Sequence, residues 1–299
     1  MLEGFICPDG QQIKLEDCYN QCRMEHRCMT LPTLKAVSEQ RKWKGLASTT
    51  QCLNGTLYEY LKLTKPFYVR PESRIFMLSG TMHHAKLEDK AKEMGMTSEI
   101  ALNIDRDIFD LIEPTSHGLE MTDYKLWGSF KVAKALGIVK SGKKPDPSGA
   151  IYKTTSKYGN KGTPKMVDNF VRDAGMAENW EAELQQNRYR VMLYDNFGLK
   201  LHRMQLQATV RDGNTFSARS RGVHGLVYLI PIPVLDDDYV KDYFNQKQAQ
   251  LALAFEQGYW DYPCNNQETW DGIRCERYCE VAEHCPVGQI IINSKEKDF

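Results

Sequence analysis

The sequence lacks several features that mark large classes of proteins. It has no apolar run close to the roughly 20 residues that a membrane-spanning helix needs. Its first residues, MLEGFICPDGQQ, carry neither a basic flank nor a long apolar segment. We therefore expect no signal peptide, no membrane partner and a cytoplasmic location. With 299 residues, 41% of them apolar and 26% charged, the composition is that of a globular protein with one or two domains.

The chain also lacks net charge, since 39 basic residues balance 39 acidic ones, which argues against a uniformly basic surface. The distribution is uneven, because residues 130–165 contain nine lysines and one acid, Asp146. The latter part of this stretch is rich in Gly, Ser, Thr and Pro and is expected to be a loop. Such a loop is either a solvated linker or, beside a catalytic site, a contact to the phosphates of a nucleic acid. The lysines considered for that contact are Lys143, Lys144, Lys153, Lys157 and Lys161.

The cysteines form two units of identical spacing. Each unit reads C-x10-C-x3-C-x5-C, and such a repetition at both ends of one chain is improbable by chance. In a cytoplasmic protein, nine cysteines indicate metal rather than disulfides. Each unit supplies four thiolates for either a structural Zn²⁺ or a [4Fe-4S] cluster, and spacing does not decide between them. The two units are Cys7, Cys18, Cys22 and Cys28, and Cys264, Cys275, Cys279 and Cys285.

Within each unit, the x3 step predicts two thiolates one turn apart on a helix face, with the outer cysteines in flanking loops. His26 lies two residues before Cys28 and His284 one residue before Cys285, so both are alternative ligands. Because each unit already has four cysteines, we expect the histidines to lie outside the ligand set or to be incidental. Cys52 is left over and is expected to be a buried apolar residue.

Periodicity and turn residues predict a mixed α/β or α+β core in the order α-β-β-α-α-β-β-α. Ser48 or Thr49 caps a short helix, a Pro-Thr-Ser-His-Gly turn joins two strands into a hairpin, and Gly198 ends a long helix. Helices are expected within 31–45, 48–64, 80–95, 128–140, 176–198 and 236–258, and strands within 103–114, 118–128, 199–213 and 223–234.

The predicted hairpin carries the residues with the clearest chemistry. Asp110 lies on its first strand, and Asp123 and Lys125 form D-x-K on its second, where alternate residues share a face. Two carboxylates together repel each other unless a divalent cation lies between them, and Mg²⁺ and Mn²⁺ favour such ligands. A neighbouring lysine can orient water and offset phosphate charge. D-x-K alone is common in proteins, so the surrounding motifs decide whether this one indicates a catalytic site.

That context is an ordered series of motifs. Upstream, G-x3-H-x3-E runs from Gly80 through His84 to Glu88, and this register favours His84 over His83. Downstream, Gln185 and Tyr189 form Q-x3-Y on the long helix. The series resembles the RecB-like branch of the PD-(D/E)XK nucleases, including its CRISPR-associated exonucleases, from about Cys52 to Cys285.

The resemblance implies a restriction-endonuclease-like central sheet flanked by helices. His84, Asp110, Asp123 and the carbonyl of Tyr124 would bind Mg²⁺ or Mn²⁺. Lys125 would position the attacking water. Gln185 and Tyr189 would hold the nucleic acid. This chain departs from the usual motifs with Phe109-Asp110 in place of Pro-Asp and Asp123 in place of Glu.

The resemblance also offers a second cysteine assignment. Several RecB-like nucleases hold a [4Fe-4S] cluster with one cysteine before the His motif and three near the C-terminus. Cys52 would then join Cys275, Cys279 and Cys285, but the internal repeat favours Cys264 in that place. The expected organisation is a cysteine-rich unit with a helix at 1–45, a nuclease core at 46–257 and a second cysteine-rich unit at 258–299.

The expected function is a metal-dependent deoxyribonuclease, exonuclease-like, in DNA recombination, repair, phage or CRISPR-type processing. Two alternatives are a non-catalytic nucleic-acid-binding module and an adaptor in a DNA-processing complex. Partners would be DNA and a helicase or recombinase. The chain has no GxxxxGK[ST] motif, so any unwinding would need a separate helicase.

Overall fold

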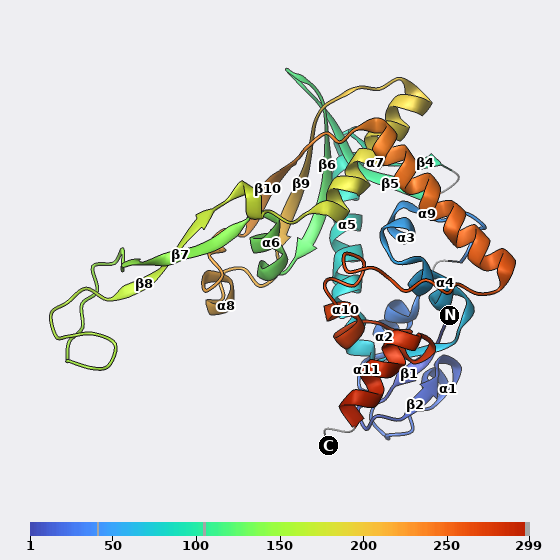
Figure 1. Cartoon of the computed structure of the whole chain (residues 1–299), viewed down its shortest axis with the longest axis horizontal. Coiled ribbons are helices and arrows are strands. Elements are labelled where there is room, and N and C mark those ends of the chain that lie inside the picture. Colours follow the sequence, from blue (N-terminus) through green and yellow to red (C-terminus); the bar gives the residue numbers. More distant parts are fainter. Residues whose placement is uncertain (41, 104–105, 297–299) are drawn as a thin grey trace.

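The structure is a computed structural model that describes residues 1–40, 42–103 and 106–296, and the strands it describes form three sheets (Figure 1). The largest sheet has the order β10-β9-β6-β5-β4. Its neighbours are antiparallel except β6 and β9, which are parallel. Its strands are β4 (Thr97–Asn103), β5 (Arg106–Thr115), β6 (Gly118–Trp127), β9 (Leu201–Val210) and β10 (Val227–Ile232). The predicted mixed α/β class is therefore confirmed.

The hairpin of β5 and β6 forms as predicted. Its register pairs Leu111 with Thr122 and Thr115 with Gly118, and Gly118 has φ +133°, which a glycine adopts without steric cost. Because β6 and β9 are parallel, the chain must cross over from the end of one strand to the start of the other. This crossover connection includes two helices, the second of which is the long helix α7 (Trp180–Phe197). Gly198, at φ +65°, ends α7 as predicted.

Two long helices pack against the sheet, and a third packs against one of them. Helix α5 (Ile75–Glu93) packs against β4, β5 and β6. Helix α7 packs against β4, β10 and α9 (Asp237–Gln257), and α9 continues to the helices near the termini (Figure 1). Among the described residues, no helix is both long and apolar enough to cross a membrane.

Several predicted boundaries differ from the structure. Helix α5 begins at Ile75 and not after Gly80, because the turn η1 (Pro71–Arg74) leads directly into it. The helix predicted in 31–45 ends at Ser38. The one predicted in 128–140 is α6 (Ser129–Ala135) and ends before Gly137, at φ +59°. Residues 41, 104 and 105, which fall within these predictions, lie outside the described residues. Strand β4 was not predicted.

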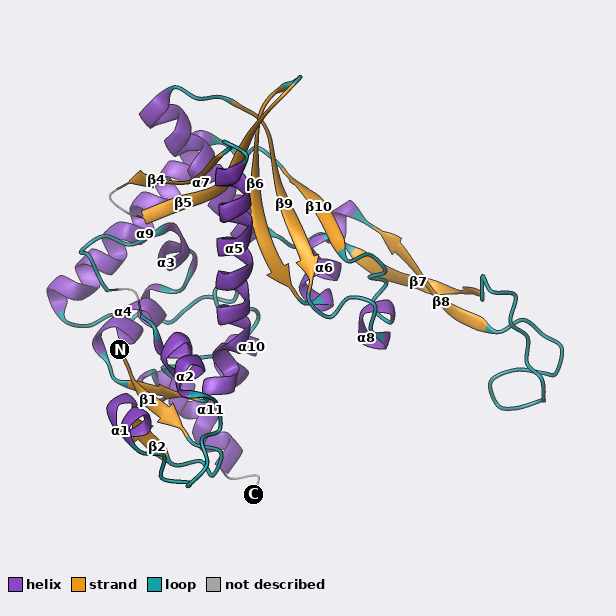
Figure 2. Cartoon of the chain, turned by 180° about the vertical axis from the view of Figure 1, so that it is seen from behind, coloured by secondary structure: helices purple, strands orange, loops and turns teal. Residues whose placement is uncertain are grey.

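The lysine-rich segment is not simply a loop, which corrects the prediction. Strands β7 (Ile138–Pro145) and β8 (Met166–Arg172) pair antiparallel into a two-stranded ribbon. The ribbon and the segment 146–165 at its tip extend away from the rest of the molecule (Figures 1 and 2). We call residues 138–172 the arm. At its base lie α6, η2 (Ala174–Met176) and α8 (Phe216–Arg219).

The two ends of the chain meet in a part with its own hydrophobic core. Phe5, Leu34 and Phe67 from the N-terminal region pack in one cluster with Phe244 of α9 and Val281. A second hydrophobic cluster, which includes Met121 and Leu206, is formed between the five-stranded sheet and the helices that pack on it. The elements of the terminal part are β1 (Leu2–Ile6), β2 (Gln12–Lys14), β3 (Phe67–Val69), α1 (Leu15–Asn20), α2 (Leu31–Ser38), α3 (Thr49–Leu53), α4 (Thr56–Thr64), α10 (Ile273–Arg277), η3 (Ala282–His284) and α11 (Pro286–Glu296).

Candidate functional site

The hairpin of β5 and β6 brings two buried carboxylates together. Asp110 lies one residue before the paired Leu111, and Asp123 lies one residue after its partner Thr122 on the other strand. Their exposed fractions are 9% and 3%. Lys125, two residues after Asp123, lies on the same side of β6, and its Nζ is 2.7 Å from Asp123 Oδ2. The D-x-K pair is therefore a close ion pair beside a second carboxylate.

Helix α5 adds an imidazole to this group. His84 Nδ1 lies 3.3 Å from Asp110 Oδ2, and the same oxygen accepts a hydrogen bond of 2.7 Å from the amide of Tyr124. The contact with Asp110 raises the pKa of His84, against the opposing effect of burial. Burial lowers the pKa of the neighbouring His83. Of the two histidines, His84 is the one in contact with Asp110, while Glu88 pairs with Lys92 on its own helix.

Helix α7 reaches the site through Gln185. Its Oε1 accepts a hydrogen bond of 3.2 Å from Lys125 Nζ, and its Nε2 donates one of 3.2 Å to the hydroxyl of Tyr189. Tyr189 is 4% exposed, and burial raises its pKa. Since so little of Tyr189 is accessible, its structural role is to hold Gln185. Gln185 in turn orients the ammonium of Lys125.

The charges of the site favour a cation. Burial raises the pKa of Asp123, Lys125 lowers it, and Asp110 raises it further. A buried pair of carboxylates needs a compensating positive charge. Asp110, Asp123 and His84 together form a donor set that suits a divalent cation. In the structure, the ammonium of Lys125 supplies the counter-charge at Asp123. Within the described residues, no group of three or more His, Cys, Asp or Glu side chains is arranged to hold a metal ion.

Sequence reasoning missed a second buried charge cluster next to the site. Arg188 Nη2 of α7 lies 3.5 Å from Asp107 Oδ2, on the strand that carries Asp110. Asp107 also accepts hydrogen bonds of 2.5 Å from the amide of Thr49 and from Asn103 Nδ2. Arg188 stacks on Phe244, 4.3 Å from the ring centroid. The sequence gives no signal for this pairing, because 80 residues lie between Asp107 and Arg188 and both residue types are common.

The N-terminal cysteines gather at one place. Cys7, Cys18, Cys22 and Cys28 line a single small cavity, which His26 and Arg23 also line. Helix α1 ends at Asn20, so Cys22 follows the helix, and the prediction of two thiolates on one helix face is wrong. Cys22 Sγ instead donates to the carbonyl of His26, at 3.3 Å. Burial raises the pKa of Cys18 and Cys28.

The C-terminal cysteines gather in the same way. Cys264, Cys275, Cys279 and Cys285 line a second cavity together with side chains of α4. Helix α10 ends at Arg277, so Cys279 again follows the helix, and the same-face prediction is wrong here too. Burial raises the pKa of Cys264 to about 11. The four thiols of each quartet of the internal repeat thus line one cavity, although, among the described residues, they are not arranged to hold a metal ion.

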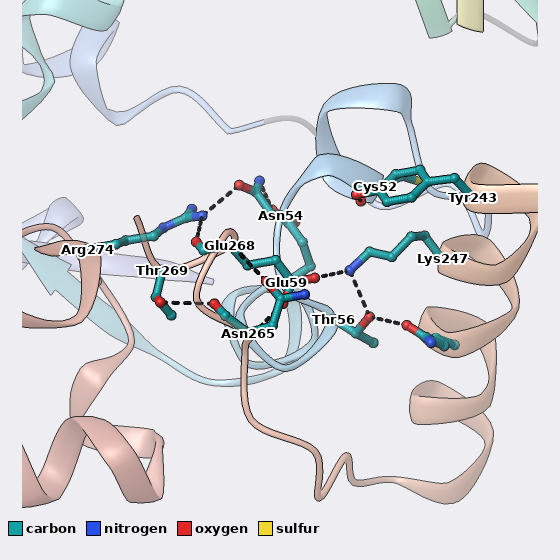
Figure 3. Close-up of polar contacts among 11 residues, drawn as sticks. Cys52, Asn54, Thr56, Glu59, Tyr243, Lys247, Asn265, Glu268, Thr269 and Arg274 are labelled. Atoms are coloured by element: carbon teal, nitrogen blue, oxygen red, sulfur yellow. Dashed lines mark hydrogen bonds and ion pairs between the residues drawn. The ribbon is translucent and has the colours of Figure 1, made fainter. Parts of the chain in front are cut away.

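A buried polar network ties the C-terminal cysteine loop to the rest of the protein (Figure 3). Lys247 Nζ of α9 lies 2.6 Å from Glu268 Oε1 and donates a hydrogen bond of 3.3 Å to Thr56. Glu268 Oε2 accepts from the amide of Asn265, next to Cys264, at 2.9 Å. Arg274, next to Cys275, donates to Asn54 Oδ1 at 2.8 Å. These bonds connect the loop to α9 and to the segment before α4.

The remaining predicted ligands lie apart from the C-terminal cavity. Cys52 is 2% exposed in α3, and its carbonyl accepts a hydrogen bond of 3.2 Å from the hydroxyl of Tyr243 (Figure 3). It does not line the cavity of Cys275, Cys279 and Cys285, whereas Cys264 does. His284 Nε2 instead contacts the carbonyl of Pro66 at 2.6 Å. The lysines considered for nucleic-acid contact are all exposed on the arm: Lys143, Lys144, Lys153, Lys157 and Lys161.

Comparison of the chain with models of known protein families, with curated proteins and with solved structures found no match.

Proposed function

We propose that this chain is a divalent-metal-dependent deoxyribonuclease of the RecB-like branch of the PD-(D/E)XK nucleases. The observation that carries the proposal is the convergence of His84, Asp110, Asp123 and Lys125 from α5, β5 and β6 into one charged cluster around two buried carboxylates. These residues span about 40 positions of the sequence, and each of them belongs to the motif series.

The architecture supports the same proposal. The D-x-K strand β6 lies in the middle of a mixed sheet, with the antiparallel β5 on one side and the parallel β9 on the other. Helix α5, which carries His84, packs against this hairpin. This arrangement fits the restriction-endonuclease-like sheet with flanking helices that the motifs imply.

Each residue has a distinct role in the proposed reaction. Asp110, Asp123, His84 and the carbonyl of Tyr124 would hold Mg²⁺ or Mn²⁺, which when bound makes water more acidic and polarises a phosphate oxygen. Lys125 orients a water and offsets the negative charge that develops on the phosphate. Gln185 fixes the position of Lys125 by accepting its hydrogen bond.

The two cysteine clusters have a structural role in this proposal. Each would hold a Zn²⁺ ion or a [4Fe-4S] cluster and fasten one end of the chain. The C-terminal cluster would fasten α4 and α9 to the end of the chain, because its loop already contacts both helices. The colour of purified protein separates the two chemistries, since iron–sulfur clusters absorb visible light and zinc does not.

One assay tests the proposed activity. End-labelled single- and double-stranded DNA is incubated with Mn²⁺ or Mg²⁺ and either native protein, Asp123→Asn or Lys125→Met. We expect each substitution to reduce cleavage by about 100-fold or more, because it removes a group that acts in the transition state. Asp261→Asn and Lys65→Met, both at exposed positions, are the matched controls and should cleave normally.

Two outcomes would contradict the proposal. Normal cleavage by both site variants would show that the reaction occurs elsewhere. DNA binding by native protein without cleavage under either cation would instead support a non-catalytic nucleic-acid-binding module or an adaptor.

A further inference from the structure

The arm is an ordered projection with its own backbone hydrogen bonds. Beyond the ribbon, the amide of Tyr152 donates to the carbonyl of Thr163 at 3.0 Å, and that of Lys165 donates to Ala150 at 2.8 Å. The ring of Tyr152 lies directly over Gly159, where an added Cβ would come within 2.3 Å of it. The tip therefore has a defined shape that presents its side chains to solvent.

The lysines near the base of the arm have partners. Lys140 Nζ lies 2.7 Å from Asp168 Oδ1 across the ribbon. Before the arm, Lys131 pairs with Glu181 at 3.5 Å and Lys134 with Glu178 at 2.5 Å. These three lysines are explained by contacts within the protein.

The lysines farther out are different. All six are exposed, and within the part of the chain that the structure describes none of them makes an ion pair. The nearby Asp146 instead accepts a hydrogen bond from the amide of Ser148, at 2.9 Å. The six are Lys143, Lys144, Lys153, Lys157, Lys161 and Lys165. Such a set of like charges on a narrow projection is repulsive by itself and suits a polyanionic partner.

The ribbon presents its cations in two directions. Lys143 and Lys144 are consecutive residues of β7, opposite Asp168 and Val167, and consecutive strand residues point to opposite faces. A two-stranded ribbon has the width that the major groove of B-form DNA admits. In that groove, phosphates of both strands flank the ribbon, and cations on both faces would reach them.

The aromatic content of the arm favours a duplex over a single strand. Proteins that bind single strands stack successive bases on several exposed aromatic rings. On the arm, Tyr158 is 72% exposed, while Tyr152 packs on Gly159 and Phe170 packs on Gly222. One exposed ring does not form a stacking platform.

We propose that the arm binds duplex DNA through its backbone, with the β7–β8 ribbon in a groove and the six lysines on the phosphates. The inference rests on the proposed function for its choice of DNA, and it defines the substrate as double-stranded along the part that the arm contacts. The contacts are independent of base sequence, because they are made by lysines to phosphates.

The test measures binding without cleavage. All proteins carry Asp123→Asn, and anisotropy of a labelled 30-base-pair duplex, and of one of its strands, is followed across a series of NaCl concentrations. The arm variant has its six outer lysines changed to Gln. A matched control has six exposed lysines elsewhere changed to Gln, with the same change in net charge: Lys14, Lys35, Lys65, Lys90, Lys200 and Lys241.

We expect the arm variant to bind the duplex at least tenfold more weakly at low salt. The plot of log affinity against log salt should become less steep, and the magnitude of its slope should decrease by up to about 5, because each lost phosphate contact removes about 0.9. The control variant should change affinity less than threefold. Equal losses in both variants, or unchanged binding by the arm variant, would overturn the proposal and leave an acidic protein as the partner to test.

A loss confined to the single strand would overturn the choice of duplex. These results are separable from those on the proposed function. If the arm variant binds normally while cleavage by the chain with native Asp123 still depends on Lys125, this inference alone fails. If Lys125→Met cleaves normally, the proposed active site fails whatever the arm does.

Discussion

Arg188 Nη2 lies 3.5 Å from Asp107 Oδ2, and each residue is less than a tenth exposed. Asp107 has φ +53°, an uncommon conformation for a residue with a side chain, and it accepts hydrogen bonds from Thr49 and Asn103. The pair therefore joins α7 and α3 to the strand that carries Asp110. The alignment of Gln185 with Lys125 depends on the same helix and sheet.

Arg188→Met should destabilise the fold strongly. The substitution keeps an apolar stem against Phe244 but leaves Asp107 buried without its cation, a change that costs about 3–5 kcal/mol in buried ion pairs. Urea unfolding followed by circular dichroism measures the change. Arg219→Met, at an exposed position, is the control and should alter stability by less than about 0.5 kcal/mol. A similar small effect of Arg188→Met would show that the pair contributes little.

Tyr189→Phe should slow cleavage without removing it. The substitution deletes the hydroxyl that accepts from Gln185, so Lys125 is held less firmly, and a lost hydrogen bond of about 1 kcal/mol corresponds to roughly a fivefold lower rate. Single-turnover rates across a Mn²⁺ titration measure it. The Mn²⁺ midpoint should stay constant, because the hydroxyl of Tyr189 acts on Gln185 and not on the carboxylates. Tyr194→Phe, on the exposed side of α7, should have the native rate.

Cys264→Ser and Cys52→Ser should separate the two cysteine assignments. Cys264 lines the cavity of the C-terminal quartet and Cys52 does not. Elemental analysis of purified protein should therefore show loss of the metal of one cluster in Cys264→Ser and native content in Cys52→Ser. The reverse result would favour the assignment in which Cys52 joins Cys275, Cys279 and Cys285.

Gly55→Ala should disturb the C-terminal cluster through crowding. A Cβ at Gly55 would lie 2.2 Å from Cys264 Sγ, so the cysteine loop must shift. We expect a loss of about 1–3 kcal/mol in stability and a lower metal content. Gly80→Ala is the matched control, because a Cβ there meets no atom within 4 Å and Ala favours the helix by about 0.5–1 kcal/mol. A stabilising Gly55→Ala would contradict the packing at Cys264.

Glu59→Gln should change how stability depends on pH. Burial raises the pKa of Glu59 in the folded protein, although Lys62 and a hydrogen bond from Asn54 oppose the shift. The folded state thus binds the proton more tightly, and this stabilisation is complete below about pH 4.3, the pKa of an unfolded glutamate, and is lost as pH rises through the folded pKa.

Because Gln stays neutral, the variant should gain stability relative to native protein as pH rises from about 4 to 7. Urea midpoints at several pH values measure the difference. Glu72→Gln, on the surface, should show no such trend. A constant difference between Glu59→Gln and native protein would show that Glu59 does not titrate in this range.

Local sequence determined the elements whose signals are local. The turn before Gly118 specified the hairpin, Ser48 caps α3 with a reciprocal bond to Gln51, and Gly198 ends α7. Alternation along β6 placed Asp123 and Lys125 on one side, and their contact follows from a spacing of two residues. The matching spacing of the cysteine repeat by itself identified two quartets, and the structure places the members of each quartet around one cavity.

Tertiary structure decided the rest, because a contact between distant segments leaves no periodic trace in the sequence. The contact of His84 with Asp110 depends on how α5 crosses the sheet. The pairing of Arg188 with Asp107 depends on the packing of α7. The arm forms from a segment rich in Lys and Gly through hydrogen bonds between strands 20 residues apart. Pattern therefore identified the chemical groups of the site, and packing alone determined which of them touch.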